Sequence, residues 1–319
     1  MTQVSCLEIC AGAGGQALGI EQAGFTPEAL VEIDKACCNT LRFNRPRWNV
    51  IEGDIREFDG ASFKGIDLLA GGVPCPPFSK AGKQLGTRDE RDLFPEALRL
   101  IDECRPRTVM LENVRGFLDP RFEEYRLLLK SKLEKMGYNV DWKILNASDF
   151  GVSQLRPRVV IVAIKRALSG SFLWPKSFQQ RPQTVGQLLY DQMAVNGWKG
   201  AEDWRQQAND IAPTLVGGSK KHGGPDLGPT RAKRAWAKLG VDGMGIANDS
   251  PACNFDGMPR LTVPMAARIQ GFPDTWHFVG KKTPTYRQVG NAFPPPVSQA
   301  VASAIYTSLS RQTVFSISR

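Results

Sequence analysis

Short runs of apolar residues alternate with amphipathic stretches through the first half of the chain. The apolar runs have the length of buried strands and occupy residues 4–9, 29–33, 50–52, 67–70, 108–111, 140–145 and 159–164. Apolar spacing typical of helices fills the intervals, most clearly at residues 93–104 and 122–136. Strands that alternate with helices at this spacing predict an α/β fold with a doubly wound sheet.

The pattern changes near the middle of the chain. Residues 166–257 are richer in Gly, Pro, Gln and Asn and lack regular alternation, whereas a helical pattern returns at residues 297–309. The change predicts a first domain over residues 1–165, a smaller irregular domain over 166–284, and a C-terminal segment, 285–319, that packs back on the first domain.

Polar residues follow the ends of the first three predicted strands. The turn Gly-Ala-Gly-Gly at 12–15 follows the first strand, Glu32 lies at the tip of the second, and Asp54 follows the third. In an open α/β sheet ligands bind outside the carboxyl ends of the strands, and an acid at the second tip accepts hydrogen bonds from ribose hydroxyls. A plain tight turn would also explain the glycines, because the full Gly-x-Gly-x-x-Gly series is absent. Together the three tips favour a nucleoside-bearing cofactor.

Cys75 stands between prolines in the segment Gly-Gly-Val-Pro-Cys-Pro-Pro-Phe-Ser. Flanking prolines and glycines favour an exposed, shaped loop over the buried environment of an inert thiol, so Cys75 is a candidate nucleophile. Glu112 ends a later strand and is expected in the same cleft, where a protonated carboxyl group would activate a ring for attack by a thiolate. Arg156 and Arg158 belong to a Gln-x-Arg-x-Arg series that is either part of this site or a solvated strand edge.

The composition is that of an ordinary globular protein, with 42% hydrophobic and 23% charged residues in a chain of 319. There is no run of about 18 apolar residues, and the N-terminus lacks the pattern of a secretory signal. We therefore expect a cytoplasmic protein that does not span a membrane. Seven cysteines without a Cys-x-x-Cys pair, and only two histidines, argue against a structural metal site or a disulfide framework.

The net charge of +9 is concentrated in two parts of the chain. Six basic residues and one acid, Asp226, occur between Lys220 and Lys238, and no acidic residue follows Thr275. Either stretch alone is as consistent with a solvated face, but the two together favour a polyanionic partner such as nucleic acid.

Taken in chain order, these motifs resemble those of the DNA cytosine-5 methyltransferases. The matching segments are Glu-Ile-Cys-Ala-Gly-Ala-Gly-Gly at 8–15, Pro-Cys at 74–75, Glu-Asn-Val at 112–114, Gln-Leu-Arg-Pro-Arg at 154–158, Arg-Ile-Gln-Gly-Phe-Pro at 268–273 and Gly-Asn-Ala at 290–292. Each segment is weak evidence alone, whereas the whole series in one order is specific. The irregular residues 166–257 fall where this family carries its target-recognition domain.

The resemblance implies a Rossmann-like fold that uses S-adenosylmethionine to methylate C5 of a cytosine flipped out of duplex DNA. Cys75 would add to C6 of the ring, Glu112 would bind or protonate N3, and Arg158 would contact the base. Arg156 is carried over as a further catalytic residue. The positions carried over as cofactor contacts are Cys10, Gly12, Ala13, Gly15, Glu32, Ile33, Asp54, Ile55, Pro74, Leu93, Asn291 and Ala292.

The expected partner is double-stranded DNA. Residues expected to contact it are Ser79, Lys80, Lys83, Lys220, Lys221, Arg231, Lys233 and Arg234. A short chain of this kind resembles the modification enzyme of a bacterial restriction system, a monomer paired in function with a restriction endonuclease; the DNA sequence it reads stays open. Two alternatives remain: a tRNA cytosine-5 methyltransferase, whose Cys-Phe-Thr tripeptide this chain lacks, and a non-catalytic DNA-binding module on the same fold.

Overall fold

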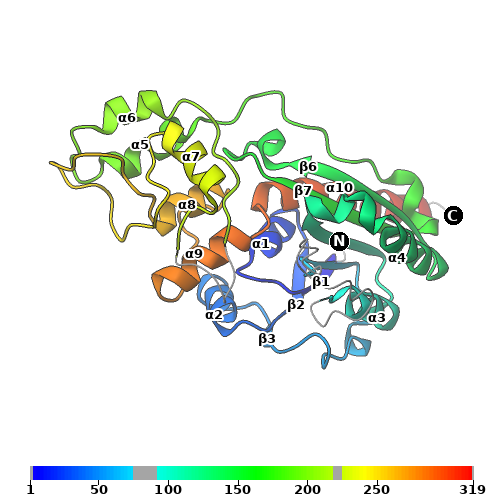
Figure 1. Cartoon of the computed structure of the whole chain (residues 1–319). Helices are drawn as coiled ribbons and strands as arrows, with labels where there is room; N and C mark the ends of the chain where they lie inside the picture. The colour runs from blue at the N-terminus through cyan, green and yellow to red at the C-terminus, as the bar shows by residue number, and fades with distance from the viewer. Residues whose placement is uncertain (1–2, 75–91, 218–224, 318–319) are drawn as a thin grey trace.

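The fold is built on one seven-stranded sheet with helices on both faces (Figure 1). The computed structural model of the chain describes residues 3–74, 92–217 and 225–317. The strands are β1 Ser5–Ile9, β2 Thr26–Glu32, β3 Val50–Glu52, β4 Leu68–Gly71, β5 Thr108–Val114, β6 Tyr138–Asn146 and β7 Pro157–Lys165. Their order across the sheet is β3-β2-β1-β4-β5-β7-β6, and the predicted α/β class is confirmed.

Strand direction divides the sheet into two parts. β1 pairs in parallel with β2 and β4, β2 with β3, and β4 with β5, as the alternation of strands and helices predicts. β7 runs antiparallel to β5 and β6, because β6 leads to β7 without a crossover helix. The carboxyl ends of the parallel strands therefore share one edge of the sheet, which is where open α/β sheets bind ligands.

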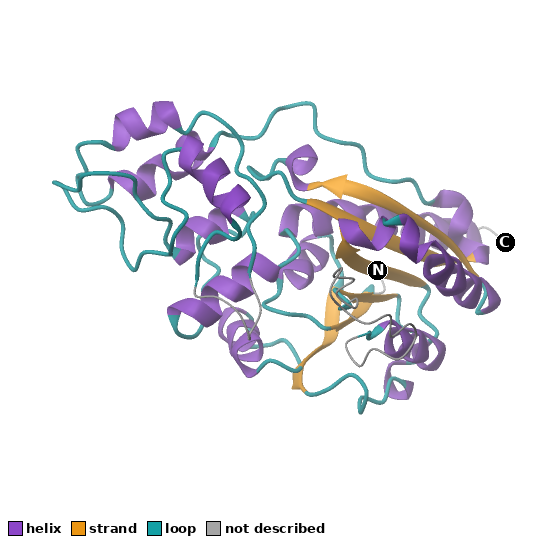
Figure 2. Cartoon of the chain, in the orientation of Figure 1, coloured by secondary structure: helices purple, strands orange, loops and turns teal. Residues whose placement is uncertain are grey.

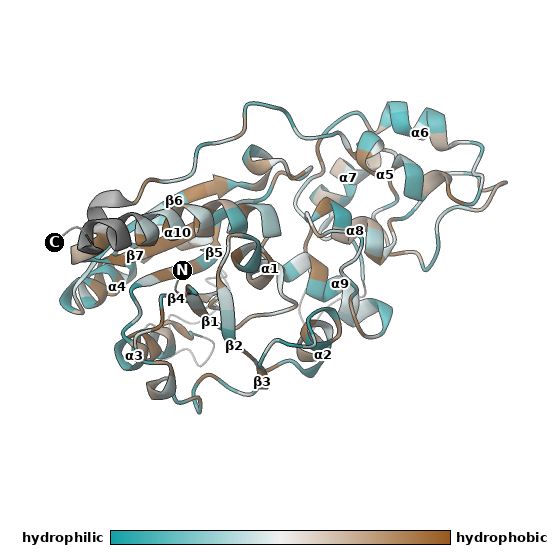
Figure 3. Ribbon diagram, turned by 180° about the vertical axis from the view of Figure 1, so that it is seen from behind, coloured by the Kyte–Doolittle hydropathy of each residue, from teal (hydrophilic) through white to brown (hydrophobic). Residues whose placement is uncertain are grey.

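Helices cover both faces of this sheet (Figure 2). Leu7 and Ile9 of β1 pack with α3 and α4, whereas Cys6 of the same strand packs with α1 and α10 on the opposite face. Figure 3 shows the hydrophobic character of β7 in this core. The bounds are α1 Gly15–Gln22, α2 Lys35–Asn44, α3 Phe94–Cys104, α4 Glu123–Lys135 and α10 Pro295–Ile317, with 3-10 turns at Ala61–Phe63, Arg115–Leu118, Pro120–Phe122, Ala147–Phe150 and Arg166–Ser171.

The remaining helices gather at the other end of the molecule (Figure 1). They are α5 Val185–Ala194, α6 Ala201–Gln207, α7 Thr230–Lys238, α8 Val263–Ile269 and α9 Lys282–Asn291. Irregular loops join them, and the described part of this region has no strand beyond an isolated bridge between Gln154 and Ala212. Its core, around Trp236, is continuous with Leu18 of α1. The three predicted domain limits stay a prediction.

None of the helices within the described ranges is long and apolar enough to cross a membrane.

Four strands, β2, β5, β6 and β7, are longer than the apolar pattern predicted, and β2 and β6 show the reason. β2 begins at Thr26 rather than at residue 29, because its first residues pair with β1 although they are only partly buried. β6 spans Tyr138–Asn146 at the edge of the sheet, where exposed residues interrupt the buried ones. Pairing with a neighbouring strand, rather than local apolarity, sets these bounds.

Glu8 lies in the middle of β1 and is 1% exposed. Neither of its carboxyl oxygens has a hydrogen-bond partner among the described residues. Burial, with a smaller contribution from Glu32, raises the pKa of Glu8 well above its ordinary value, because ionisation would leave an unpaired charge in the core. Glu8 therefore favours its neutral form in the folded protein.

We predict that Glu8→Gln stabilises the protein increasingly as the pH rises. The folded-state pKa of Glu8 lies above the unfolded-state value, so the native protein loses stability between these two values as the pH increases. Because glutamine stays neutral, its advantage in the free energy of unfolding should grow by up to about 1.4 kcal/mol per pH unit inside that window and vanish near about pH 4. Urea unfolding at several pH values measures this, and a pH-independent difference would contradict it.

Candidate active site

A cavity of about 440 Å³ opens at the carboxyl ends of the parallel strands. Its walls come from the turn after β1, the residues that follow β2, β3 and β4, and the end of α9. Glu112, near the end of β5, lines the same cavity. The residues expected to contact a cofactor all lie in this lining: Cys10, Gly12, Ala13, Gly15, Glu32, Ile33, Asp54, Ile55, Pro74, Leu93, Asn291 and Ala292. The fold thus gathers residues that are far apart in the sequence.

The turn after β1 places its backbone at the cavity. Cys10, Gly12 and Gly14 have φ angles of 51°, 56° and 89°, in the region that favours glycine. A Cβ atom on Gly15 would lie 2.2 Å from the carbonyl oxygen of Phe293, so α1 approaches the C-terminal segment only because no side chain is present. α1 begins without a side-chain cap and without an acid in its first turn, so no side chain there neutralises its positive end.

The cavity lining contains two acidic side chains, one at the last residue of β2 and one shortly after β3. Glu32 is 8% exposed, and its carboxylate accepts hydrogen bonds of 2.7 Å from the backbone N–H groups of Gly12 and Asp34. Burial raises the pKa of Glu32, and these backbone hydrogen bonds oppose the rise. Asp54 pairs through Oδ2 with Nη1 of Arg56 at 2.8 Å. Each carboxylate oxygen has two lone pairs, so both acids can accept further hydrogen bonds.

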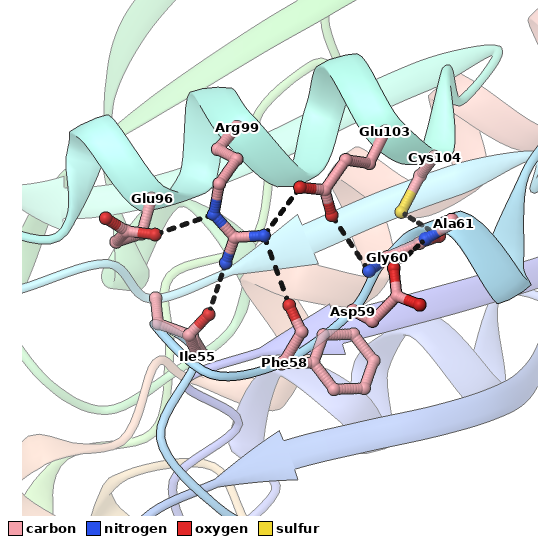
Figure 4. Close-up of polar contacts among 9 residues, drawn as sticks. All are labelled: Ile55, Phe58, Asp59, Gly60, Ala61, Glu96, Arg99, Glu103 and Cys104. Carbon is pink, nitrogen blue, oxygen red and sulfur yellow. Dashed lines mark hydrogen bonds and ion pairs between the residues drawn. The ribbon is translucent and has the colours of Figure 1, made fainter.

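An arginine of α3 holds the stretch after β3 in place (Figure 4). Arg99 donates to the carbonyl oxygen of Ile55 at 2.7 Å and to that of Phe58 at 3.2 Å. Its guanidinium also pairs with Glu96 at 2.8 Å and with Glu103 at 2.6 Å, which fix it from both sides. Because Ile55 lines the cavity, this network positions one of its walls.

Glu112 and Arg158 form an ion pair on adjacent antiparallel strands. Nε of Arg158 lies 2.8 Å from Oε1 of Glu112, and both side chains are 13% exposed. Burial raises the pKa of Glu112, while the positive charges of Arg158 and Arg156 act in the opposite direction. Gly72 lies beside this carboxyl group, since a Cβ at Gly72 would be in van der Waals contact with Oε2 of Glu112 at 3.4 Å. The site therefore contains an oriented carboxyl group that holds a proton more readily than an exposed glutamate.

The structure gives Arg156 a different place from the catalytic position expected. It is 1% exposed and is not among the residues that line the cavity. Its guanidinium donates to the carbonyl oxygens of Leu215 at 2.8 Å, Gly290 at 2.7 Å and Ala292 at 3.0 Å. Because these hydrogen bonds go to the backbone rather than into the cavity, Arg156 acts as a positioning residue.

Two buried glutamines extend this cluster. Nε2 of Gln154 donates to Oε1 of Gln270 at 2.7 Å, and Oε1 of Gln154 accepts from the N–H of Leu215 at 2.9 Å. Gln270 donates in turn to the carbonyl oxygen of Ala292. We name Gln154, Arg156 and Gln270 the buried clamp. It ties the chain before β7 to the segment around Leu215 and to the end of α9.

Several predicted residues lie outside the described part of the chain: Cys75, Ser79, Lys80, Lys83, Lys220 and Lys221. The described residues that flank the first gap meet at the cavity, where the N–H of Leu93 donates to the carbonyl oxygen of Pro74 at 3.3 Å. Asn113 donates to the carbonyl oxygen of Val73 at 3.1 Å and so ties this point to β5. Pro74, the residue before Cys75 in the sequence, therefore lines the same cavity as Glu112.

The other predicted DNA contacts lie on α7. Arg231 and Arg234 are exposed, and Lys238 extends the same face at helical spacing. None of these three has an ion-pair partner within the ranges that the structure describes. Lys233 differs, because it is partly buried and pairs with Asp226 at 2.7 Å. The structure therefore separates a free basic face from a lysine whose charge is already balanced.

The sequence interpretation assigned Asn291 and Ala292 at the end of α9 to the cofactor site but missed two neighbouring residues, Arg287 and Gly217. A Cβ on Gly290 would lie 2.5 Å from Cα of Gly217, so this pair of glycines lets the segment after Leu215 contact the helix directly. Arg287 lines the cavity one helical turn before Asn291. The spacing of four residues between Arg287 and Asn291 places both on one face of a helix. This spacing could have pointed to Arg287 only if a helix had been predicted over these residues.

A family model described as C-5 cytosine-specific DNA methylase matches residues 4–307. The chain belongs to this family. It is 58% identical over 313 residues to Type II methyltransferase M.NgoMIV of Neisseria gonorrhoeae, a match that covers 97% of this chain and 99% of that protein. It is 54% identical over 318 residues to Type II methyltransferase M.NaeI of Lentzea aerocolonigenes, covering 98% of this chain and 77% of that protein.

Solved structures with the same fold have much lower sequence identity. The Entamoeba histolytica methyltransferase EhMeth has a TM-score of 0.67 at 14% identity, covering 97% of this chain and 99% of that one. A DNMT2 variant of Spodoptera frugiperda has a TM-score of 0.65 at 17% identity, covering 95% and 99%. These likenesses show the fold. The family match and the Type II relatives do not favour the tRNA-methyltransferase and binding-module alternatives.

Replacing Arg156 with methionine should destabilise the fold strongly. The change removes the side-chain donor to the buried carbonyl oxygens of Leu215 and Gly290, whereas that of Ala292 keeps its hydrogen bond from Gln270. Each buried carbonyl oxygen left without a donor costs about 1–3 kcal/mol. The matched control Arg231→Met removes an exposed arginine and should change stability by no more than about 0.5 kcal/mol. Urea unfolding of both variants compares them, and equal losses would show that the buried clamp does not hold these segments.

Proposed function

We propose that this protein is a Type II DNA cytosine-5 methyltransferase that uses S-adenosylmethionine. One observation carries the proposal: a single cavity is lined both by Glu112, whose carboxyl group pairs with Arg158, and by the residues that the family motifs assign to the cofactor. The family match supplies the reaction class. The Type II relatives, matched over nearly the whole chain, support a modification enzyme that works beside a restriction endonuclease in the cytoplasm, and we expect it to act as a monomer.

The cavity fits S-adenosylmethionine in chemistry as well as in position. Glu32 keeps lone pairs for the ribose hydroxyls, and Asp54 keeps lone pairs for the amino group of adenine. Ile33 lines the cavity and is 65% exposed, so it offers apolar surface to the adenine ring. The uncapped start of α1 favours a negatively charged group. Bound there, S-adenosylmethionine supplies the electrophilic methyl group that C5 of the cytosine accepts.

Cys75 is the proposed nucleophile, on the strength of its sequence motif and of Pro74 in the cavity wall. Its thiolate forms a bond to C6 of cytosine, the ring double bond moves to C4–C5, and N3 takes a proton from Glu112. C5 is then electron-rich enough to accept the methyl group. Afterwards a solvent base removes the proton from C5, N3 returns its proton to Glu112, the C5–C6 double bond forms again, and the thiolate of Cys75 leaves.

The ion pair with Arg158 prepares Glu112 for this role. Nε of Arg158 fixes one carboxyl oxygen at 2.8 Å, which leaves the other free to face the base. Burial raises the pKa of Glu112, so the proton needed at N3 is held at a higher pH than by an exposed glutamate. The reacting atoms of cytosine are covered inside stacked DNA, so the base must leave the duplex to reach this cavity.

The exposed face of α7 is the proposed DNA-contacting surface among the described residues. Arg231, Arg234 and Lys238 share this face, and their charges are available to phosphates. Lys233 is a weaker candidate because Asp226 already balances its charge. Ser79, Lys80, Lys83, Lys220 and Lys221 remain proposed contacts on the basis of sequence alone.

The methylation test uses mixed-sequence duplex DNA with S-adenosylmethionine, read at base resolution by bisulfite sequencing. The unaltered protein should protect cytosines within one short sequence motif, and Cys75→Ser should protect none, because a serine hydroxyl is a far weaker nucleophile at neutral pH. Retained binding of duplex DNA by Cys75→Ser would show that the fold survives the change. Absence of protected cytosines with the unaltered protein, or full activity in Cys75→Ser, would overturn the proposal.

The salt dependence of DNA binding tests the α7 surface. Arg231→Ala and Arg234→Ala should each weaken binding and lower the slope of log K against log salt by about 1, because one phosphate contact is lost in each variant. Lys233→Ala is the matched control on the same helix and should lower the slope less, since Asp226 already pairs with this lysine. Equal slopes in all three variants would place the DNA elsewhere.

A further inference from the structure

Among the described residues, two cations line the cavity, and they differ in what holds them. Arg56 follows β3 and lies 2.8 Å from Asp54, a full ion pair. Arg287 lies on α9, and Nη2 is 4.0 Å from Oδ2 of Asp34, at the outer limit of an ion pair. The side chain of Arg287 is 20% exposed, so its charge is partly removed from water while its pairing is loose.

The two cations also belong to different walls of the cavity. Arg56 lies beside Asp54, which is the residue proposed for the adenine amino group. Arg287 lies one helical turn before Asn291, in the wall that packs on the start of α1. S-adenosylmethionine carries a single negatively charged group, the carboxylate of its amino-acid portion. Of the two cations, Arg287 has the looser ion pair, and it lies in the same cavity lining as the turn that leads into the positive end of α1.

We propose that Arg287 binds the α-carboxylate of S-adenosylmethionine. The assignment rests on the proposed function of the cavity. A guanidinium forms strong, directional hydrogen bonds with a carboxylate, whereas the helix end contributes only a partial charge. Asp34 holds Arg287 at the cavity, and the long separation of 4.0 Å leaves the guanidinium free to turn toward a closer acceptor. Arg287 is thus a cofactor-binding residue outside the motifs that the sequence comparison identified.

The test compares two ligands that differ only in this carboxylate. S-adenosylmethionine and its decarboxylated form are titrated calorimetrically into the full-length protein without DNA, so that no methyl transfer occurs. The unaltered protein should bind S-adenosylmethionine about ten- to a hundredfold more tightly, the range expected for one charge-assisted hydrogen-bonding contact. Arg287→Gln should reduce this preference to a few-fold while the Kd of the decarboxylated ligand changes little. Arg287→Lys keeps the positive charge but loses the paired N–H donors of the guanidinium. Its preference for S-adenosylmethionine should therefore lie between those of the unaltered protein and Arg287→Gln.

Two matched variants separate a carboxylate contact from a general effect on the cavity. Arg56→Gln removes the other cation, and it should leave the preference for the carboxylate intact. Asp34→Asn removes the acid that faces Arg287 but still caps α2 through its side-chain oxygen, so the preference should persist or increase. Binding of the decarboxylated ligand by each variant reports that the cavity is folded.

Three results would overturn the assignment. An unchanged preference in Arg287→Gln would show that the carboxylate binds elsewhere, with the backbone at the start of α1 as the remaining partner. An equal loss of affinity for both ligands in Arg287→Gln would show that Arg287 shapes the cavity without contacting the carboxylate. If the unaltered protein binds neither ligand, the proposed function itself fails, and the assignment falls with it.

Discussion

The guanidinium of Arg156 is the point on which the site depends, because two segments distant in sequence, around Leu215 and at the end of α9, converge on it. Its donors reach the carbonyl oxygens of Leu215, Gly290 and Ala292, and it is 1% exposed. Buried carbonyl groups need partners, and these three would otherwise lie at the junction of separate loops and helices. The wall of the cavity formed by α9 and the segment that leads toward α7 are therefore fixed relative to β7 by Arg156 together with Gln154 and Gln270.

The same stretch of chain carries the ion-pair partner of Glu112, the carboxyl group proposed to protonate the base. Arg158 begins the pairing of β7 with β5, and the antiparallel register sets it opposite Val114, two residues beyond Glu112. Its side chain reaches back to Glu112 at 2.8 Å. Two arginines separated by one proline thus make different contacts, since the buried Arg156 binds backbone carbonyl groups and the less buried Arg158 binds a carboxyl group in the cavity lining. The contacts of the two arginines differ because the side chain of Arg156 points toward Leu215 and the end of α9, whereas that of Arg158 points toward Glu112.

Much of the fold and of the cavity lining could be predicted from the sequence, because both depend on short-range patterns. Apolar runs locate the strands, and the ends of parallel strands must share an edge, so Glu32 and Asp54 were expected together. The role of Arg156 could not be predicted, since its partners are carbonyl oxygens up to 136 residues away. Arg287 and Gly217 were missed for the same reason: their importance arises from contact with α9, and Lys282–Asn291 gave no helical signal of its own.

Charge separates the two proposed ligands of this protein. The described cavity lining contains the acids Glu32, Asp34, Asp54 and Glu112, which suit a cofactor with a sulfonium and an ammonium group. The same acids repel a phosphate backbone, which agrees with the proposal that DNA binds outside the cavity, on the basic face of α7. A flipped cytosine is neutral and can enter where its phosphates cannot. Arg287 is the more loosely paired of the two cations in this acidic lining, and a cofactor that also carries one carboxylate gives its presence there a physical reason.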